Sequence, residues 1–561
     1  MLLLPAFFSN FACQNYPKGC VTNPWDGYQY LSRIRSTVFS RTSYFKGFLH
    51  ILRVAWTTWL PLIGLFSIIG CTESFPDHTL RFGLANAPTN LDPRYATDAT
   101  SARINRLIYS RLVDFDEGAI PIPALATWIE VSPTHYRFDL LEPRPIFHHG
   151  VQLSAYDVKT TYESILNPQT ASPHRGILQI ITRIDAPTAT TVDFFLKQPD
   201  SLFPGYLVIG ILPANLITSG HPFHNHPIGS GPFQFIQRPD ETRLVIERRT
   251  DGQRVEFLRI PDPTVRTLKL LAKEIHLLQN DLPPELVSYL SEHEGITLQQ
   301  RQGANFAYLG FNQLDPVVGR ENVRKAIAHA INRKQIIQYV LRGRARVAQA
   351  LLPPEHWAGL SSLAGYDYNP GEAKHLLEEA GFDKDHRPAI TYKTSTDPFR
   401  LRLATIIQYQ LHQVGIDVSI QSHDWGTFYG DIKTGRFQMY SLAWVGVKSP
   451  DIFRYAFHSD SIPPAGANRG HYSDAMADRL MTQAEHTSDK QAQQTLYRTL
   501  QARLSDTLPY VPLWFEDHFA LSSASITGYQ LGADGNFDGL IQVRWATSPS
   551  LPSQHVTLLH P

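Results

Sequence analysis

The distribution of cysteines is the feature that most limits how this chain can fold. All three cysteines, Cys13, Cys20 and Cys71, lie near its start, and the rest of the 561-residue chain contains none. A disulfide framework, a cysteine-based zinc site and a catalytic cysteine are therefore excluded from that long body. The body must be stabilised by apolar burial. The composition of the whole chain allows this, because 43% of its residues are hydrophobic and 18% are charged.

The charges of the chain balance, with 51 Lys and Arg residues against 51 Asp and Glu residues. This balance argues against a nucleic-acid partner held by bulk positive charge, but it does not exclude a local basic patch. The length is sufficient for about three or four domains, each with its own hydrophobic core. We therefore expect a large globular protein without a nucleic-acid partner.

An apolar stretch without charges, residues 56–70, directly precedes Cys71. It is short for a membrane-spanning helix, which needs about 20 apolar residues, and it fits the apolar part of a secretory signal. We predict a signal segment over 48–70 and a lipidated N-terminus with a linker over 71–76, because Gly70-Cys71 resembles a bacterial lipoprotein processing site. The alternative is a buried or signal-anchor helix that ends in cysteine.

Residues 1–47 precede the predicted signal and show no coherent core. We interpret them as an N-terminal extension that arises from a translation start assigned too early. A real cytoplasmic extension is the alternative.

The body alternates between strand-like and helix-like patterns. Period-two alternation predicts strands, and apolar residues at helical spacing predict amphipathic helices. The serine of a capping box, Ser154, precedes one of these helices. The predicted strands are 78–85, 135–141, 191–196, 416–421, 510–514 and 519–521, and the predicted helices are 101–112, 157–166, 321–341, 369–381, 399–414, 474–484 and 490–508.

The usual motifs of catalysis are missing from the sequence. It has no phosphate-binding loop, no metal-binding H-E-x-x-H helix and no G-x-S-x-G nucleophile elbow. Carboxylates are numerous, so inspection of the sequence alone does not exclude a catalytic pair of the kind that glycosidases use. We expect no enzyme and no cofactor. His221, His224 and His226 have a spacing that could ligate a transition metal, but a polar surface loop is the plainer interpretation.

A series of short motifs runs in order along the body. It includes residues 87–93, 123–128, 147–158, 227–233, 308–312, 323–333, 367–377 and 414–418. Together these motifs resemble the family 5 extracellular solute-binding proteins, the oligopeptide- and dipeptide-binding components of bacterial ABC importers. The resemblance covers about residues 78–535.

This resemblance implies an α/β, bilobal periplasmic-binding-protein-like fold of the large class with an extra domain. Two lobes would be joined by a hinge around a ligand cleft. The implied segments are 77–111, 226–302 and 510–545 for a discontinuous lobe I, 112–225 for domain II, 303–509 for lobe III, and 546–561 for a C-terminal tail.

The resemblance also suggests residues that contact the ligand. Trp425 and Trp444 match tryptophans that line the cleft in this family, and their large rings give contact area with little side-chain selectivity. The alternative for each is a place in the core. Tyr95, just past the first matched motif, and Asn312, at the end of the motif 308–312, are further candidates.

The loop after Trp444 departs from the family pattern. Peptide-binding members usually carry an aspartate three residues further on, which pairs with the peptide's α-ammonium, but this position holds Val447 with Lys448 next to it. Asp451 matches a later family aspartate, which either fixes the loop or binds the amine. Since an ammonium without a partner is costly to desolvate, a peptide with a free N-terminus needs another carboxylate or binds poorly. Lys448 would favour a carboxylate or phosphate if it faces the cleft, and would do nothing if it faces solvent.

The function implied is an extracytoplasmic lipoprotein of the periplasm or cell envelope, anchored to the membrane through Cys71. It would act as a monomer that captures peptides or similar solutes and delivers them to an ABC permease with its ATPase subunits. Alternatives within the same fold are another cargo, such as a modified or anionic peptide, a cell-wall fragment, a sugar, chelated nickel or haem, or a role as a ligand sensor.

Overall fold

The computed structural model describes residues 78–546, and an eleven-stranded mixed sheet is the largest element in this part of the chain. Ten strands follow one another in the sheet, and β13 pairs with β17 at its side. In sheet order the strands are β15 (Asp417–His423), β14 (Ala389–Ser395), β16 (Met439–Trp444), β12 (Ile296–Phe311), β17 (Tyr510–Ser523), β11 (Leu277–Gln279), β1 (Leu80–Leu84), β10 (Arg254–Arg259), β9 (Arg243–Arg248) and β8 (Phe233–Asp240), with β13 at Ala345–Val347.

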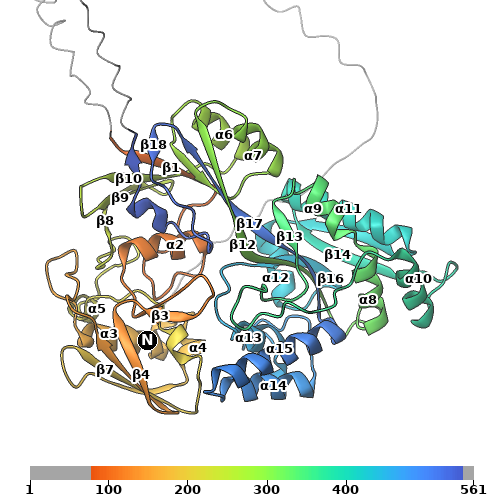
Figure 1. Cartoon of the computed structure of the whole chain (residues 1–561), viewed down its shortest axis with the longest axis horizontal. Coiled ribbons are helices and arrows are strands. Elements are labelled where there is room, and N and C mark those ends of the chain that lie inside the picture. Colours follow the sequence, from red (N-terminus) through yellow and green to blue (C-terminus); the bar gives the residue numbers. More distant parts are fainter. Residues whose placement is uncertain (1–77, 547–561) are drawn as a thin grey trace, which may run out of the picture. The chain divides into compact units, whose positions relative to one another are not determined.

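Two long antiparallel strands, β12 and β17, connect the two halves of this sheet (Figure 1). The C-terminal end of β17 also pairs with β11, and the C-terminal end of β12 pairs with β16. Because β12 and β17 are antiparallel, these two contacts lie at opposite ends of the strand pair. The register between β12 and β17 shifts between Arg301 and Asn305. The prediction of two separate strands over 510–514 and 519–521 is wrong, because the hydrogen bonds to β12 continue along both segments.

A smaller four-stranded antiparallel sheet lies within the predicted domain II. Its order is β4 (Ala126–Ser132), β5 (His135–Leu140), β7 (Thr191–Leu196) and β6 (Ile181–Asp185). Helix α3 (Ala155–Leu166) packs on it through Tyr162, whose ring meets Phe194 of β7 edge-on at 5.7 Å. The Asp157 carboxylate accepts hydrogen bonds from the amide and the hydroxyl of Ser154, so Ser154 marks the start of α3 as predicted.

Two-stranded pairs are formed by β2 (Val113–Phe115) with β3 (Pro121–Pro123) and by β18 (Ile526–Thr527) with β19 (Arg544–Trp545).

The second half of the chain supplies most of the helices, as the periodicity predicts. The other helices of the described residues are α2 (Ala99–Ile108), α4 (Arg175–Leu178), α5 (Ala214–Thr218), α6 (Pro263–Leu271), α7 (Pro284–Ser291), α8 (Glu321–Ala330), α9 (Arg333–Tyr339), α10 (Pro370–Glu379), α11 (Pro398–Gln413), α12 (Trp425–Lys433), α13 (Ile452–Phe457), α14 (Ala475–Glu485) and α15 (Lys490–Thr507).

The single helix predicted over 321–341 is wrong, because the structure breaks it into α8 and α9. The Asn332 side chain accepts a hydrogen bond from the Gln335 amide and so begins a second helix. The buried Arg333 guanidinium donates to the carbonyl oxygens of Ala348 and Pro512, at 2.9 and 3.1 Å. These tertiary contacts outweigh the continuous apolar spacing of the segment.

The predicted domain II shares a hydrophobic core with part of the predicted lobe III. Phe138 and Phe194 of the small sheet belong to the same buried cluster as Phe453 and Tyr497 from α13 and α15. The Ser201 amide and hydroxyl both donate to the Glu485 carbonyl at the end of α14, at 3.0 Å each. This core therefore joins segments that the resemblance assigns to different domains, while the domain boundaries themselves stay predictions.

Candidate ligand-binding site

A cavity of about 2410 Å³ opens between the two halves of the large sheet. This volume exceeds the roughly 300–1,000 Å³ of ordinary small-molecule pockets, so it suits a peptide-sized ligand. Its wall is discontinuous in sequence: it includes residues 85–89, 280–284, 395–400 and 516–519. The last of these segments belongs to β17, so a connecting strand forms part of the wall.

Charged side chains are prominent on this wall. The Arg400 guanidinium, near the start of α11, lies 2.8 Å from the Glu516 carboxylate on β17. Burial pushes the pKa of Glu516 upward, but the neighbouring arginine outweighs it and holds the pKa below its usual range. The two charges therefore largely neutralise each other within the cavity.

Trp425 lines the cavity and is 60% exposed there. It is the first residue of α12, and the preceding Asp424 caps this helix by accepting a hydrogen bond from the Thr427 amide. One helical turn further on, Tyr429 stacks on the Trp425 ring with centroids 5.4 Å apart and planes 5° apart. Trp425 thus presents a supported aromatic face to a ligand.

Trp444 lies at the end of β16, outside the cavity wall, and packs against the largest hydrophobic core. Its ring stacks on Tyr308 at 6.3 Å. Arg469, which is 7% exposed, places its guanidinium 5.3 Å from the Trp444 ring and 5.4 Å from the Tyr429 ring. The two predicted tryptophans therefore belong to one stack, joined by an arginine that the sequence analysis missed. No pattern around Arg469 marks it.

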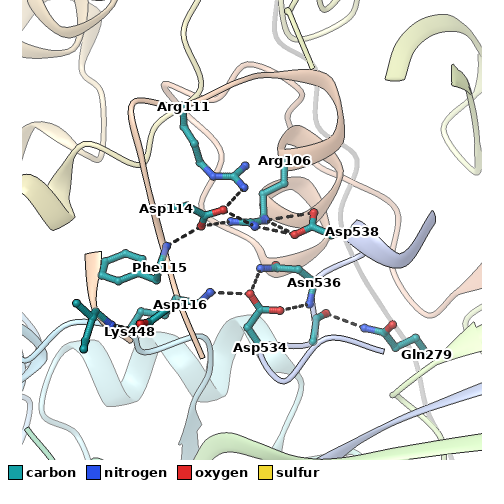
Figure 2. Close-up of polar contacts among 12 residues, drawn as sticks. Arg106, Arg111, Asp114, Phe115, Asp116, Gln279, Lys448, Asp534, Asn536 and Asp538 are labelled. Atoms are coloured by element: carbon teal, nitrogen blue, oxygen red, sulfur yellow. Dashed lines mark hydrogen bonds and ion pairs between the residues drawn. The ribbon is translucent and has the colours of Figure 1, made fainter. Parts of the chain in front are cut away.

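Lys448 faces neither the cavity nor open solvent. Its Nζ atom lies 2.6 Å from an Asp534 carboxylate oxygen, and its ammonium is 5.9 Å from the Phe115 ring (Figure 2). Burial raises the pKa of Asp534, but Lys448 outweighs it and lowers that pKa to about 2. Val447, beside it, packs against the largest core. Both residues are thus engaged within the protein.

A second group of charges lies next to this pair (Figure 2). The Arg106 guanidinium bridges Asp114 and Asp538, at 3.0 and 2.6 Å, and Arg111 reaches Asp114 at 2.6 Å. Arg106 comes from α2 and Asp114 from β2. These ion pairs therefore fix the start of the predicted domain II to the large-sheet side of the chain.

The remaining candidates make local contacts and do not line the cavity. The Asp451 carbonyl accepts the Tyr455 amide at 3.1 Å at the start of α13, and burial raises the pKa of its carboxyl to about 6. The Asn312 side chain donates to the Gly435 carbonyl and accepts the Leu314 amide. Tyr95 is half-buried beside the Arg94 guanidinium, 5.5 Å from its ring.

Among the described residues, the three histidines considered as possible metal ligands do not form a metal site. A His221 ring nitrogen makes a hydrogen bond with the His226 carbonyl at 2.6 Å, and His226 lines the cavity. Between residues 78 and 546, no group of three or more His, Cys, Asp or Glu side chains is placed to hold a metal ion. His224 lies in the same exposed loop.

The membrane predictions fall outside the described residues. Cys71, the signal segment 48–70 and the extension 1–47 all precede residue 78. Within the described part of the chain, none of the helices is both long enough and apolar enough to span a membrane.

An open cavity of this size, with charged and aromatic walls and two strands joining its sides, defines a protein that binds a solute. The model of the bacterial extracellular solute-binding proteins, family 5 (middle region), matches residues 120–463. The chain belongs to this family, which confirms the resemblance and the bilobal α/β fold that it implied. The family consists of extracytoplasmic solute-binding proteins.

Relatives with names and solved structures agree with this assignment. The dipeptide-binding protein of Escherichia coli is 26% identical over 80% of this chain and 92% of its own length. The heme-binding protein A of Haemophilus influenzae is 24% identical over 82% and 90%. The structure of the binding protein DppA from Helicobacter pylori with the peptide STSA superposes with a TM-score of 0.72 at 26% identity, covering 83% of this chain and 98% of that one.

Proposed function

We propose that this protein is the solute receptor of an ABC importer that captures peptides or solutes of similar size. The observation that carries the proposal is the 2410 Å³ cavity, whose wall combines the Trp425 ring with charged groups from both halves of the sheet. Relatives named for dipeptides and oligopeptides support a peptide cargo. The receptor would pass its cargo to a membrane permease driven by ATPase subunits.

Closure of the two halves around the ligand is the physical basis of this function. A ligand that contacts both 280–284 and 395–400 binds the closed state more tightly than the open state, so it shifts the population towards closure. The permease would then recognise the closed state. Binding alone accomplishes this, so we propose no catalytic activity, and one chain supplies the whole wall, which is consistent with a monomer.

We further propose that the mature protein is held at the membrane by lipid on Cys71. The support is the uncharged run over 56–70 that ends at Gly70-Cys71. A diacylated and N-acylated cysteine anchors stably, whereas a single acyl chain binds membranes only marginally. The cavity would then face the extracytoplasmic space, where free solutes are collected.

A non-peptide cargo is the second candidate. Among the relatives with solved structures are one from Campylobacter jejuni with Ni(L-His), at 24% identity and a TM-score of 0.73, and one from Agrobacterium tumefaciens with agropinic acid, at 22% and 0.70. A chelated metal brings its own ligands, so it would not need a protein metal site. A sensor would use the same cavity without a permease.

Native mass spectrometry of the protein purified from its own cells tests the cargo. We expect a co-purified mass in the range of a short peptide, released on denaturation and sequenced by fragmentation. Calorimetry with that peptide should then give saturable binding at one site per chain. A released metal chelate or porphyrin, with no binding of peptides, would refute the peptide proposal in favour of the second candidate.

A further inference from the structure

Three helices begin at the cavity wall, since the first residues of α2, α6 and α11 and the aspartates that cap them line it. Asp98, Asp262 and Asp397 each accept a backbone amide of the helix that they cap, at 2.8 to 2.9 Å. The positive end of a helix favours a negative charge at this position, so the helices compensate these three carboxylates. The capping aspartates therefore do not offset the arginines that line the same cavity.

Arg103 is a lining arginine whose charge has no direct partner among the described residues. It lies in the second turn of α2, is half-buried, and makes no hydrogen bond or ion pair with any residue from 78 to 546. Its guanidinium lies over the ring of buried Phe537, 5.6 Å from the centroid, and this contact holds the side chain. Arginine has five N–H donors in a planar fork that matches the oxygens of a carboxylate or a phosphate. These donors are available to a ligand.

The charges around Arg103 are net positive. Two acids act on it, and one of them, Asp534, is already paired with Lys448 at 2.6 Å. The other, Asp281, is shared with two further arginines. The charged side chains that act on Arg103 and Asp281, together with their ion-pair partners, are four cations and three carboxylates: Arg103, Arg266, Arg400 and Lys448, with Asp281, Glu516 and Asp534. The excess cation favours an anion at this part of the wall.

Burial and the neighbouring acids act on the Arg103 guanidinium in opposite directions. Burial lowers its pKa, and although Asp281 and Asp534 raise it, the pKa stays below the usual value of an arginine. The acids present therefore do not fully compensate the desolvation of this charge. An oxyanion in contact with the guanidinium would supply the compensation that is missing.

A second lining arginine, Arg344, also has no acid partner among the described residues. Its guanidinium donates to the Ser288 hydroxyl at 3.2 Å, and its Nε atom is buried without an acceptor in this part of the chain. Arg344 belongs to the predicted lobe III and Arg103 to the predicted lobe I. Each predicted lobe thus contributes to the wall one guanidinium that no carboxylate neutralises.

We propose that Arg103 anchors an oxyanion of the ligand, a carboxylate or a phosphate, within the cavity. The inference rests on the proposed function as a solute receptor and deepens it by naming an anionic class of cargo. The oxyanion would accept from the free donors of Arg103, and Arg344 would add a second contact from the other predicted lobe. In a peptide the oxyanion is the α-carboxylate, an acidic side chain or a phosphorylated side chain.

Calorimetry on the purified protein with matched pairs of tripeptides tests this assignment. Each pair differs by one anionic group: Ala-Glu-Ala against Ala-Gln-Ala, Ala-phosphoserine-Ala against Ala-Ser-Ala, and the tightest binder of this set against its C-terminal amide. We expect the anionic member of at least one pair to bind the parent at least tenfold more tightly, and that pair identifies the source of the oxyanion.

Three variants locate the preference. Arg103→Gln should weaken binding of the anionic member about tenfold and leave the neutral member unchanged. Asp281→Asn should not weaken the anionic member, because it removes a competing acid. Arg342→Gln, which removes the same charge from an exposed arginine outside the wall, should preserve the preference of the parent.

Each other outcome decides a different point. If tripeptides bind but no pair favours its anionic member, the anion anchor is refuted while the peptide function stands. If Arg103→Gln weakens both members of a pair equally with an unchanged melting temperature, Arg103 shapes the cavity and is no anion anchor. Equal losses in Arg103→Gln and Arg342→Gln would reduce the effect to net charge and overturn the assignment. If no tripeptide binds the parent, the peptide function fails, and the solute released from the purified protein decides the anion anchor: an anionic solute supports it, and a neutral or cationic one refutes it.

Discussion

Lys448 and Asp534 are joined by an ion pair of 2.6 Å although 86 positions separate them in the sequence. The resemblance assigns Lys448 to lobe III and Asp534 to lobe I. The pair therefore connects two parts of the chain that a solute receptor must bring together. A residue that the sequence suggested as a ligand contact is, in the structure, a contact between predicted lobes.

Removing this pair should weaken ligand binding moderately. Both side chains are about one-quarter exposed, so we expect Lys448→Met to cost roughly 1 kcal/mol of closure, or about fivefold in affinity. Calorimetry on Lys448→Met, Asp534→Asn and the double variant forms a cycle that isolates the coupling. Additive effects of the two changes would show that the pair does not contribute to closure.

Trp425 should contribute to affinity more than to stability, because its ring is 60% exposed on the cavity wall. We expect Trp425→Ala to weaken binding of the co-purified ligand about tenfold, or about 1.4 kcal/mol, with little change in melting temperature. Tyr409→Ala is a matched control, since Tyr409 is a 65% exposed aromatic on α11 outside the wall. Equal losses in both variants would contradict a specific role for Trp425.

The stability of the protein should depend on the protonation of Asp200. Burial raises the pKa of this carboxyl to about 7, although Tyr206 donates to it at 3.0 Å. In the unfolded chain the pKa of an aspartate is about 3.9, so between about pH 4 and pH 7 the native state binds more protons. The contribution of Asp200 to the free energy of unfolding is therefore present at low pH and lost as the pH rises through about 7.

Denaturant unfolding at pH 5 and pH 7.5 checks this sign. Relative to the parent, Asp200→Asn should gain stability as the pH rises, by at most about 1.4 kcal/mol per pH unit. His148, His356 and His518, whose pKa values burial lowers to about 4, give the opposite trend in both proteins and cancel in the comparison. A difference between the two proteins that does not vary with pH would contradict the assignment.

Cys71→Ser should release the protein from the membrane if lipid is its anchor. Detergent phase partitioning of the parent and the variant measures this directly. We expect the parent in the detergent phase and the variant in the aqueous phase, because the acyl chains supply the membrane affinity. A variant that stays in the detergent phase would indicate that residues 56–70 act as an anchor helix.

Local signals predicted much of the fold. Asn369 caps α10 by accepting the Glu372 amide, and Thr191–Leu196 forms β7 with the predicted bounds. Such elements are set by capping and alternation within a short segment. The break between α8 and α9 was not predictable in this way, since the buried Arg333 obtains its hydrogen-bond partners from Ala348 and Pro512, which are remote in sequence.

The candidate site was less accessible to sequence reasoning. Trp425 could be found because a matched motif carries it. Arg469 could not, because its value depends on Trp444 and Tyr429, which come from other segments of the chain. An isolated arginine has no sequence pattern that reveals what surrounds it.

The position of β17 has a consequence for the synthesis of the chain. This strand lies between β12 and β11 in the large sheet and also holds β13, although it starts only at Tyr510. Polypeptide elongation runs from the N-terminus, so the ribosome adds this central strand after every other strand of the sheet. A nascent chain that stops before Tyr510 leaves the hydrogen-bonding edges of β11 and β12 without the strand between them, and the sheet is complete only when residues 510–523 have been made.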